Sequence, residues 1–360
     1  MVKIKTIALI FGGRSAEHEV SVVSAKNVFA AIDKKKYEIL LIGITHQGEW
    51  LQIGKENFLN KQFSRVEKKS GKSAIPFFKE GQFFIKAGTK ESRINIVFPV
   101  LHGPFGEDGS IQGLLKFFNV PFVGAGILGS AIGMDKVISK RLLREANIPT
   151  AKFISFEKNQ KNKINFAEIQ KNLGVPLFIK PANLGSSVGI SKVKNKKEFQ
   201  KAVDFAFKYD TKIIIEESIK GKEIECSVLG NDNPIASLPG EIIPTHEFYS
   251  YKAKYLDKNG AKMAIPANIS KKLIQEIQDL AIKTYETLCC EGMGRVDFFL
   301  TEDDKIFVSE INTIPGFTSI SMYPKLWEAS GISYKKLIDK LISLAIERYE
   351  KENKLKNSIV

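Results

Sequence analysis

Residues 294–312, GRVDFFLTEDDKIFVSEIN, decide how this chain is read, because two apolar runs flank a short acidic turn. Such runs predict two antiparallel β-strands joined as a hairpin. Side chains two apart share a face of a strand, so Glu310 and Asn312 point the same way, and strand pairing brings Asp297 beside them. A poorly hydrated carboxylate is unfavourable unless a positive group meets it. The hairpin is therefore expected to face a cation.

Three oxygen-bearing side chains on one face suit Mg²⁺ held jointly with phosphate, and Asp297, Glu310 and Asn312 are its predicted ligands. Two neighbouring carboxylates could instead share one proton as an acid–base pair, although the amide favours the metal. Arg295 lies on the same face and is placed to bind a phosphate or an oxyanion. The non-functional alternative is a surface hairpin with scattered acidic residues. The apolar runs on either side of the acidic turn disfavour it, because they would be exposed on both faces.

A glycine-rich loop forms the second motif, FIKPANLGSSVGISKV at residues 178–193. Glycine lets backbone N–H groups converge on an anion, and Lys180 precedes a loop that holds Gly185, Ser186 and Ser187. The GxxxxGK[ST] pattern of the P-loop is absent, and a strand follows rather than a helix. An ordinary hairpin is the alternative, but the lysine favours phosphate binding.

Two further loops, FGGRSAEHEVS at 11–21 and LHGPFGEDG at 101–109, each follow a predicted strand. Ligands bind at that edge of α/β sheets, so both loops are expected to face one crevice. The structural alternative stays open, because helix capping alone would explain Glu19 and a buried His102 could be structural.

The first third of the chain alternates strands and helices, which predicts a doubly wound parallel sheet. Its expected strands are residues 5–13, 37–45, 94–103 and 120–126. The polar, lysine-rich stretch 52–92 is not placed by the pattern. After Pro149 the pattern becomes α+β, with short strands in quick succession, one helix among them at 197–209, and long helices at 270–290 and 333–350.

Composition bounds the possible functions. A chain of 360 residues predicts two or three domains, and the net charge of +14 comes from lysines spread along the chain, often beside acids. A solvated surface is therefore favoured over nucleic-acid binding. No apolar run reaches the ~18–20 residues of a membrane span. Three cysteines without CxxC indicate a reducing cytoplasmic setting, and four dispersed histidines argue against zinc.

Eight motifs, taken in their order, resemble the D-alanine–D-alanine ligase family of the ATP-grasp superfamily. They are FGGRSAEHEVS, LHGPFGEDGSIQG, MDK, KPANLGSSVG, EFYSYKAKY, GRVDFF, EINTIPGFTSISMYP and ASGISY. The resemblance spans about residues 5–345 and implies an N-terminal α/β substrate domain (1–135), a central lid domain (136–219) and a C-terminal catalytic, Mg²⁺-binding domain (220–360), with the ATP-grasp module at about 140–345.

The implied function is the ATP-dependent joining of two D-alanines, through an acyl phosphate, for peptidoglycan precursor synthesis. ATP-binding roles carry over to Lys136, Lys180, Gly185, Ser186, Ser187, Glu216, Ile219, Glu223 and Lys254. The resemblance also implies that Glu310 bridges two Mg²⁺ ions at the Asp297 and Asn312 site, with Mn²⁺ as the alternative metal.

Catalytic roles carry over to Arg295 and the Gly316 backbone N–H as oxyanion donors, and to a hydrogen-bonded triad of Glu19, Ser186 and Tyr255. The implied substrate-binding residues are Glu19, His102, Lys254, Ser321 and Met322. The family is commonly homodimeric, so a homodimer is expected. Tyr255 favours an amine as the second substrate, with D-serine left open beside D-alanine. Two functions compete with this one: a different ATP-grasp carboxylate–amine ligase, and an ATP-binding regulatory protein without catalysis.

Overall fold

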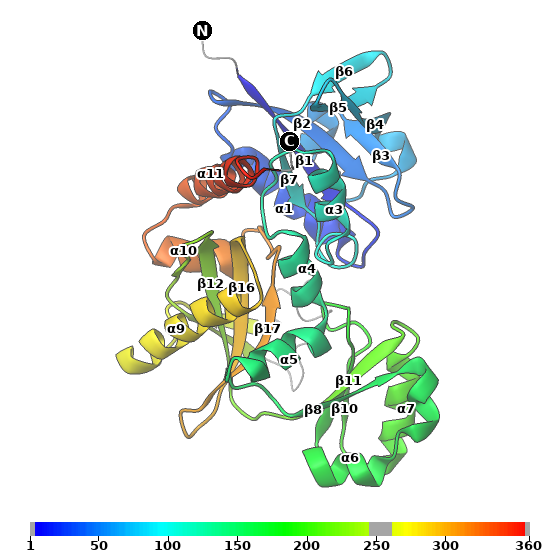
Figure 1. Ribbon diagram of the computed structural model, residues 1–360, viewed down its shortest axis with the longest axis vertical. Helices are drawn as coiled ribbons and strands as arrows, with labels where there is room; N and C mark the ends of the chain where they lie inside the picture. The colour runs from blue at the N-terminus through cyan, green and yellow to red at the C-terminus, as the bar shows by residue number, and fades with distance from the viewer. Residues whose placement is uncertain (1–3, 245–260, 357–360) are drawn as a thin grey trace.

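The computed structural model describes residues 4–244 and 261–356, whose strands form three separate sheets. Figure 1 shows them as three lobes, with the first sheet in blue and cyan, a second in green, and the third mainly in yellow and orange. The fold therefore combines α/β and α+β parts, as the change of pattern after Pro149 predicts. Within the described residues, no helix has both the length and the apolar character needed to cross a membrane.

The first sheet has seven strands in the order β6-β5-β4-β3-β2-β1-β7. They are β1 (Lys5–Gly12), β2 (Tyr37–Ile44), β3 (Trp50–Ile53), β4 (Gly71–Lys79), β5 (Gln82–Ala87), β6 (Lys90–Arg93) and β7 (Ile96–Val100). Only β2, β1 and β7 run parallel, and β3 to β6 continue the sheet antiparallel. The expected parallel sheet is confirmed for β2, β1 and β7, and antiparallel strands extend it into a mixed sheet.

Two sequence expectations change in this part of the chain. The strand expected at 120–126 is reduced to one bridge between Val97 and Phe122, because Pro121 has no N–H to donate and Gly124 turns the backbone to a φ of +100°. The unplaced stretch 52–92 contains α2 (Lys55–Leu59) and the hairpin strands β4, β5 and β6. Glu80 and Gly81 both have positive φ at the first hairpin turn, which matches the right-handed twist of paired strands.

Helices cover both faces of the first sheet. One face packs against α1 (His18–Ala31) and α11 (Tyr334–Glu352), and the other packs against α3 (Ser110–Phe117). Figure 1 shows α11, in red, beside the blue N-terminal elements although it ends the chain. The last helix therefore completes the core of the first sheet.

The second sheet has the order β10-β9-β11-β8 and is antiparallel. Its strands are β8 (Phe153–Glu157), β9 (Leu177–Pro181), β10 (Ser191–Val193) and β11 (Lys212–Glu217). Helices α6 (Phe166–Leu173) and α7 (Lys196–Ala206) bury one face of it. Helix α6 was not expected from the sequence.

The third sheet contains β12 (Lys222–Gly230), β13 (Ile235–Ala236), β14 (Gly240–Pro244), β15 (Ala261–Ala264), β16 (Gly292–Leu300) and β17 (Ile306–Asn312). One face is apolar and packs against α9 (Lys271–Thr287) and the end of α5 (Lys136–Glu145). Strand alternation places the polar side chains of β12, β16 and β17 on the opposite face. A shorter helix, α10 (Met322–Ala329), packs against β12.

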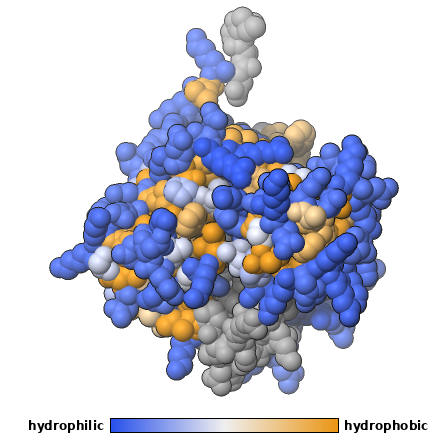
Figure 2. All heavy atoms as spheres, turned by 90° about the horizontal axis from the view of Figure 1, so that it is seen from below, coloured by the Kyte–Doolittle hydropathy of each residue, from blue (hydrophilic) through white to orange (hydrophobic). Residues whose placement is uncertain are grey.

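The surface is mainly hydrophilic on the side drawn in Figure 2, where hydrophobic residues form smaller groups among polar ones. Many surface lysines have acidic partners, such as Lys36 with Asp339 at 3.5 Å and Lys161 with Asp204 at 2.7 Å. Exposed pairs of this kind contribute little to stability. Their presence fits the interpretation of the positive charge as a solvated surface.

Candidate functional site

The β16–β17 hairpin forms as the sequence predicts, and its register decides the site. Asp297 lies opposite Glu310, and Arg295 lies opposite Asn312. On the other side of β16, Glu225 of β12 lies opposite Asp297. All five side chains therefore share the polar face of the third sheet, because opposite residues and residues two apart point the same way.

Arg295 is the centre of this face. Its Nε and Nη2 lie 2.7 and 2.8 Å from the two carboxylate oxygens of Asp297, and Nε is also 2.9 Å from Oε2 of Glu225. The amide of Asn312 donates to Oδ2 of Asp297 at 2.9 Å. A guanidinium held by two carboxylates has a fixed direction. The expected group of Arg295, Asp297 and Asn312 is thus brought together.

Glu310 has a cation of its own, Lys136 of α5, whose Nζ is 3.4 Å from Oε2. Lys136 is the first residue of α5, and the side chain of Asp135 caps that helix by accepting the N–H groups of Val137 and Ile138. The same Nζ donates to the backbone oxygen of Leu184, at 2.7 Å, just before the glycine loop. Lys136 therefore links β17 with that loop.

Lys180 and Glu216 meet across β9 and β11, with Nζ 2.6 Å from Oε2. The other oxygen of Glu216 lies 3.1 Å from Nζ of Lys140, a residue outside the motifs of the sequence. Burial alone raises the pKa of Glu216, but the two lysines outweigh it and lower that pKa to about 2. Lys140 follows Lys136 by one helical turn, and that spacing is the signal that could have found it.

The glycine loop has an anion-binding type of backbone. Ser186 and Ser187 are consecutive residues with positive φ, at 53° and 59°, and Gly189 follows with a φ of 73°. Such turns aim backbone N–H groups into one concavity. A side chain at Gly189 would come within 2.6 Å of the Pro181 ring, so this glycine lets the loop fold over the end of β9.

Glu17, and not Glu19, lies against this loop. A Cβ on Gly185 would be 3.7 Å from Oε2 of Glu17, and a Cβ on Gly103 would be 3.1 Å from the same oxygen. Glu19 instead accepts a hydrogen bond from Arg65 at 2.8 Å and lies 3.6 Å from His46. Sequence reasoning missed Glu17, although it stands only two residues earlier in the same motif.

His102 is a buried link between loop 101–109 and the turn after β17. Its Nδ1 is 2.9 Å from the backbone oxygen of Ile314, and its Nε2 is 3.2 Å from Oγ of Ser24. Burial lowers the pKa of His102, so the neutral ring is favoured. Glu107 reinforces the link by accepting the N–H groups of Gly103 and Ile314, at 2.8 and 2.9 Å. Loop 101–109 is therefore fastened to the turn after β17.

The turn after β17 places Gly316 against Ser321. A Cβ at Gly316 would lie 2.7 Å from Oγ of Ser321, so a side chain here would require that hydroxyl to move. The Ser321 hydroxyl accepts the N–H of Thr318 at 2.9 Å. Met322 is buried with Ile242 and Leu326, and its expected contact with substrate stays a prediction.

The remaining expected residues are placed as follows. Glu223 lies on β12 two residues before Glu225 and acts electrostatically on Lys180. Ile219 is half-buried in the connection between β11 and β12. Lys254 and Tyr255 lie outside the described residues. Across the described ranges, no cluster of three His, Cys, Asp or Glu side chains is suited to a metal; the hairpin set has two carboxylates and an amide.

Comparisons with known proteins agree over nearly the whole chain. Residues 6–125 match the family model described as D-ala D-ala ligase N-terminus, and residues 142–343 match D-ala D-ala ligase C-terminus. A D-alanine–D-alanine ligase of Oceanobacillus iheyensis is 49% identical, with 98% of each chain covered.

Two solved structures are similar as well. The D-alanine–D-alanine ligase of Coxiella burnetii has a TM-score of 0.88 at 39% identity, covering 98% of this chain and 97% of that one. The VanG D-Ala:D-Ser ligase of Enterococcus faecalis has a TM-score of 0.85 at 40% identity, covering 95% and 100%.

Proposed function

The chain belongs to the D-alanine–D-alanine ligase family, and we propose that the polar face around the β16–β17 hairpin is its nucleotide and metal site. The protein is an ATP-dependent ligase that joins two D-alanines for peptidoglycan precursor synthesis. The observation that carries the site proposal is the pairing of Asp297 with Glu310 across two strands, beside Arg295 and within reach of Lys136.

The reaction proceeds in two steps on this proposal. A carboxylate oxygen of the first D-alanine attacks the γ-phosphorus of ATP, and the bond to ADP breaks, which gives an acyl phosphate. The amine of the second D-alanine then attacks the acyl carbon, loses a proton, and phosphate leaves. Lys136 and Lys180 neutralise charge on the phosphates. Arg295 and the Gly316 N–H stabilise the oxyanion, and one such donor contributes about 3–4 kcal/mol.

The metal proposal assigns two Mg²⁺ ions, or Mn²⁺, to Asp297, Glu310 and Asn312. The donor set fits, because two carboxylates lie side by side next to Arg295 and Lys136. Oxygen ligands with room for phosphate oxygens are what Mg²⁺ prefers. When bound, Mg²⁺ supplies positive charge against the phosphate oxygens.

For the ammonium of the first D-alanine we favour Glu17 over Glu19, since Glu17 is the one beside Gly103 and Gly185. His102 then acts by holding the turn that carries Gly316, and Ser321 lies beside that glycine. Lys254 and Tyr255 remain proposals from the resemblance, for ATP or substrate binding and for the closing triad with Ser186.

Phosphate release from ATP tests the function directly. We expect release with D-alanine and none with L-alanine, because a site that fixes ammonium and carboxylate groups distinguishes enantiomers. D-serine and D-lactate, each added with D-alanine, would show how strictly the second substrate is chosen, a question raised by the similarity to a D-Ala:D-Ser ligase. Equal rates with D- and L-alanine would overturn the stereospecific function.

The metal assignment is tested by Glu310→Gln, which keeps the side-chain volume but removes the charge. We expect turnover to be lost and the far-ultraviolet circular dichroism to be unchanged, because Glu310 is only half-buried. Mg²⁺ binding by calorimetry in the presence of a non-hydrolysable ATP analogue supplies a second readout. Dipeptide synthesis near the wild-type rate would remove Glu310 from the metal site.

A homodimer in the cytoplasm is the setting we propose for this enzyme, from the family resemblance and from three cysteines that form no CxxC pair. Light scattering on the eluting protein measures the oligomeric state. A monomer at micromolar concentration would contradict the dimer without affecting the assignment of the site.

A further inference from the structure

Lys140 is a buried lysine to which the proposed chemistry gives no task. Only 2% of its side chain is exposed. Its Nζ lies 3.1 Å from Oε1 of Glu216 and donates to Oγ1 of Thr150 at 2.7 Å. A buried ammonium is unfavourable unless its neighbours compensate for the lost water. Keeping a lysine here therefore calls for a function that an apolar side chain would not fulfil.

Through Glu216, Lys140 is connected to Lys180 in the proposed nucleotide site. Glu216 gives Oε1 to Lys140 and Oε2 to Lys180, so the two lysines fix the rotation of its carboxylate. Exposure of the side chains increases along this row, from 2% for Lys140 and 5% for Glu216 to 16% for Lys180. The row thus begins in the core and ends at the lysine proposed to meet the phosphates.

Through Thr150, Lys140 is also connected to β17, the strand that carries Glu310. The hydroxyl of Thr150 donates to the backbone oxygen of Val308 at 2.9 Å, and the N–H of Val308 donates to Pro149 at 2.8 Å. Val308 stands two residues before Glu310 on β17. Lys140 therefore connects β11 of the second sheet with β17 of the third. Figure 1 shows its helix, α5, lying between these two sheets.

We propose that Lys140 is a positioning residue for ATP: it holds Glu216 so that Lys180 is directed at the phosphates, and through Thr150 it sets the second sheet against β17. This inference rests on the proposed ATP site. Lys140 touches neither substrate on this view, so its loss should weaken ATP binding and leave D-alanine binding almost unchanged.

Removing Lys140 should also make ATP binding pH-dependent. Burial raises the pKa of Glu216, and Lys140 and Lys180 together lower it to about 2, well below the assay range. With one lysine gone, that pKa rises, and protonation of Glu216 at lower pH releases Lys180. The other charged groups that act on the two lysines are Glu310 of β17 and Glu223 of β12, and the substitution changes neither of them.

Steady-state kinetics of Lys140→Met tests the inference. We expect the KM for ATP to rise about tenfold, as for the loss of one charge-assisted hydrogen bond, with kcat and the KM for D-alanine within about threefold of wild type. The ratio of variant to wild-type KM for ATP should be larger at pH 6 than at pH 8.5. Lys140→Arg should restore part of the affinity. Lys272→Met is the control, because Lys272 is a helical lysine with an acidic neighbour but is exposed.

A double-mutant cycle separates this role from a general loss of packing. If Lys140 acts mainly through Glu216, adding Lys140→Met to Glu216→Gln should raise the KM for ATP by no more than about threefold, the rise that the contact with Thr150 accounts for, which is well short of the roughly tenfold rise expected in the wild-type background. An unchanged KM for ATP in Lys140→Met, or fully additive effects in the cycle, would overturn the inference. If the wild-type enzyme releases no phosphate from ATP in the presence of D-alanine, the proposed function itself is overturned.

Thr150→Val keeps the lysine and removes only the hydroxyl, so it serves if Lys140→Met does not fold. We expect the KM for ATP to rise by about threefold in this variant, since the hydroxyl's two hydrogen bonds, from Lys140 and to Val308, are lost while the ion pair of Lys140 with Glu216 is kept. Wild-type KM for ATP in a folded Thr150→Val variant would contradict the link between the two sheets.

Discussion

At the scale of single residues, Glu17 and Glu19 show how two identical side chains in one motif differ in surroundings. Glu17 is the N-cap of α1 and Glu19 lies in its first turn, yet Glu17 lies beside Gly103 and Gly185 and Glu19 beside Arg65. The motif EHE does not tell them apart, because the difference comes from loops far away in the sequence. The sequence therefore predicts a glutamate in this motif as the substrate-binding residue, and the choice between Glu17 and Glu19 stays a proposal.

Paired substitutions at these positions decide which glutamate meets the substrate. We expect Glu17→Gln to lower kcat/KM for D-alanine about a hundredfold, as for the loss of a charged hydrogen bond. Glu19→Gln should cause a much smaller loss, since an exposed pair with Arg65 is worth little. Phosphate-release kinetics with varied D-alanine measures both. The reverse order would return the role to Glu19.

The pKa of Glu216 predicts how stability depends on pH. Its pKa is lowered from 4.5 to about 2 in the folded chain. A lowered carboxyl pKa contributes stability that is present above the unfolded value and is lost as the pH falls from about 4.5 toward 2. The full shift corresponds to about 3 kcal/mol.

Urea unfolding of wild type and Glu216→Gln between pH 5 and pH 2.5 measures this contribution. We expect the wild-type free energy of unfolding to fall more steeply than that of the variant over this interval, although the variant is less stable at pH 7 because two buried lysines lose their partner. Parallel pH profiles would show that Glu216 is not held ionised by Lys140 and Lys180.

At the scale of elements, strand alternation predicted the β16–β17 hairpin and the shared face of Asp297, Glu310 and Asn312 from residues 294–312 alone. The metal on that face stays a proposal. Period-2 patterns work there because one face is buried under α9 and the other is polar. The same logic fails for β4, where exposed and half-buried residues adjoin and little alternation is left. The turn between β4 and β5 is Glu80–Gly81. This dipeptide is not among the two-residue turns, such as Asn-Gly or Asp-Gly, that predict a hairpin from sequence.

Helix α11 shows a second limit of sequence patterns. Its apolar periodicity predicts a helix with one buried face, but not which surface buries that face. Leu337, Leu341 and Ile342 pack with β1, β7 and α1 of the first sheet. A hydrophobic stripe carries no information about its partner, because the burial free energy is non-directional.

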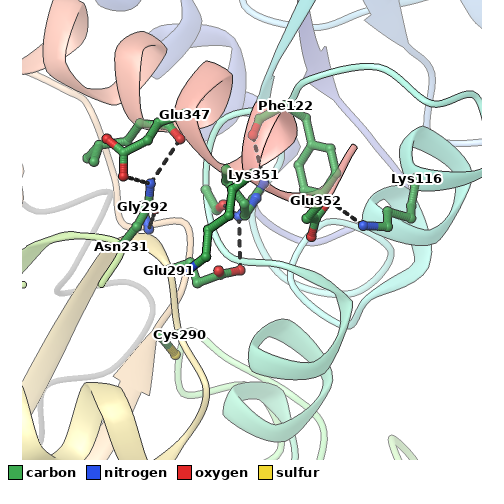
Figure 3. Close-up of polar contacts among 12 residues, drawn as sticks. Lys116, Phe122, Asn231, Cys290, Glu291, Gly292, Glu347, Lys351 and Glu352 are labelled. Carbon is green, nitrogen blue, oxygen red and sulfur yellow. Dashed lines mark hydrogen bonds and ion pairs between the residues drawn. The ribbon is translucent and has the colours of Figure 1, made fainter. Parts of the chain in front are cut away.

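At the scale of the whole molecule, α11 ties the first sheet to the third. The division into 1–135, 136–219 and 220–360 stays a prediction, and two helices are packed across it. Figure 3 shows Asn231, which follows β12, reaching Glu347 of α11, and Lys116 of α3 reaching Glu352. Helix α5, assigned to the central part, buries Leu143 against α9. The third sheet is therefore joined to the first through α11, and to α5 through apolar packing.

Arg348 is the buried centre of this junction, and its loss should reduce stability. The guanidinium donates to the backbone oxygens of Gly124 and Phe122, at 2.6 and 2.8 Å, and lies 3.6 Å from Glu291 at the start of β16. Arg348→Met leaves two buried carbonyl groups without a donor, so we expect the free energy of unfolding in urea to fall by about 2–4 kcal/mol. Lys340→Met, an exposed change on the same helix, should leave it within about 0.5 kcal/mol. If Arg348→Met proves as stable as that control, α11 is held to the two sheets by its apolar face alone, and the polar junction contributes nothing to their relative placement.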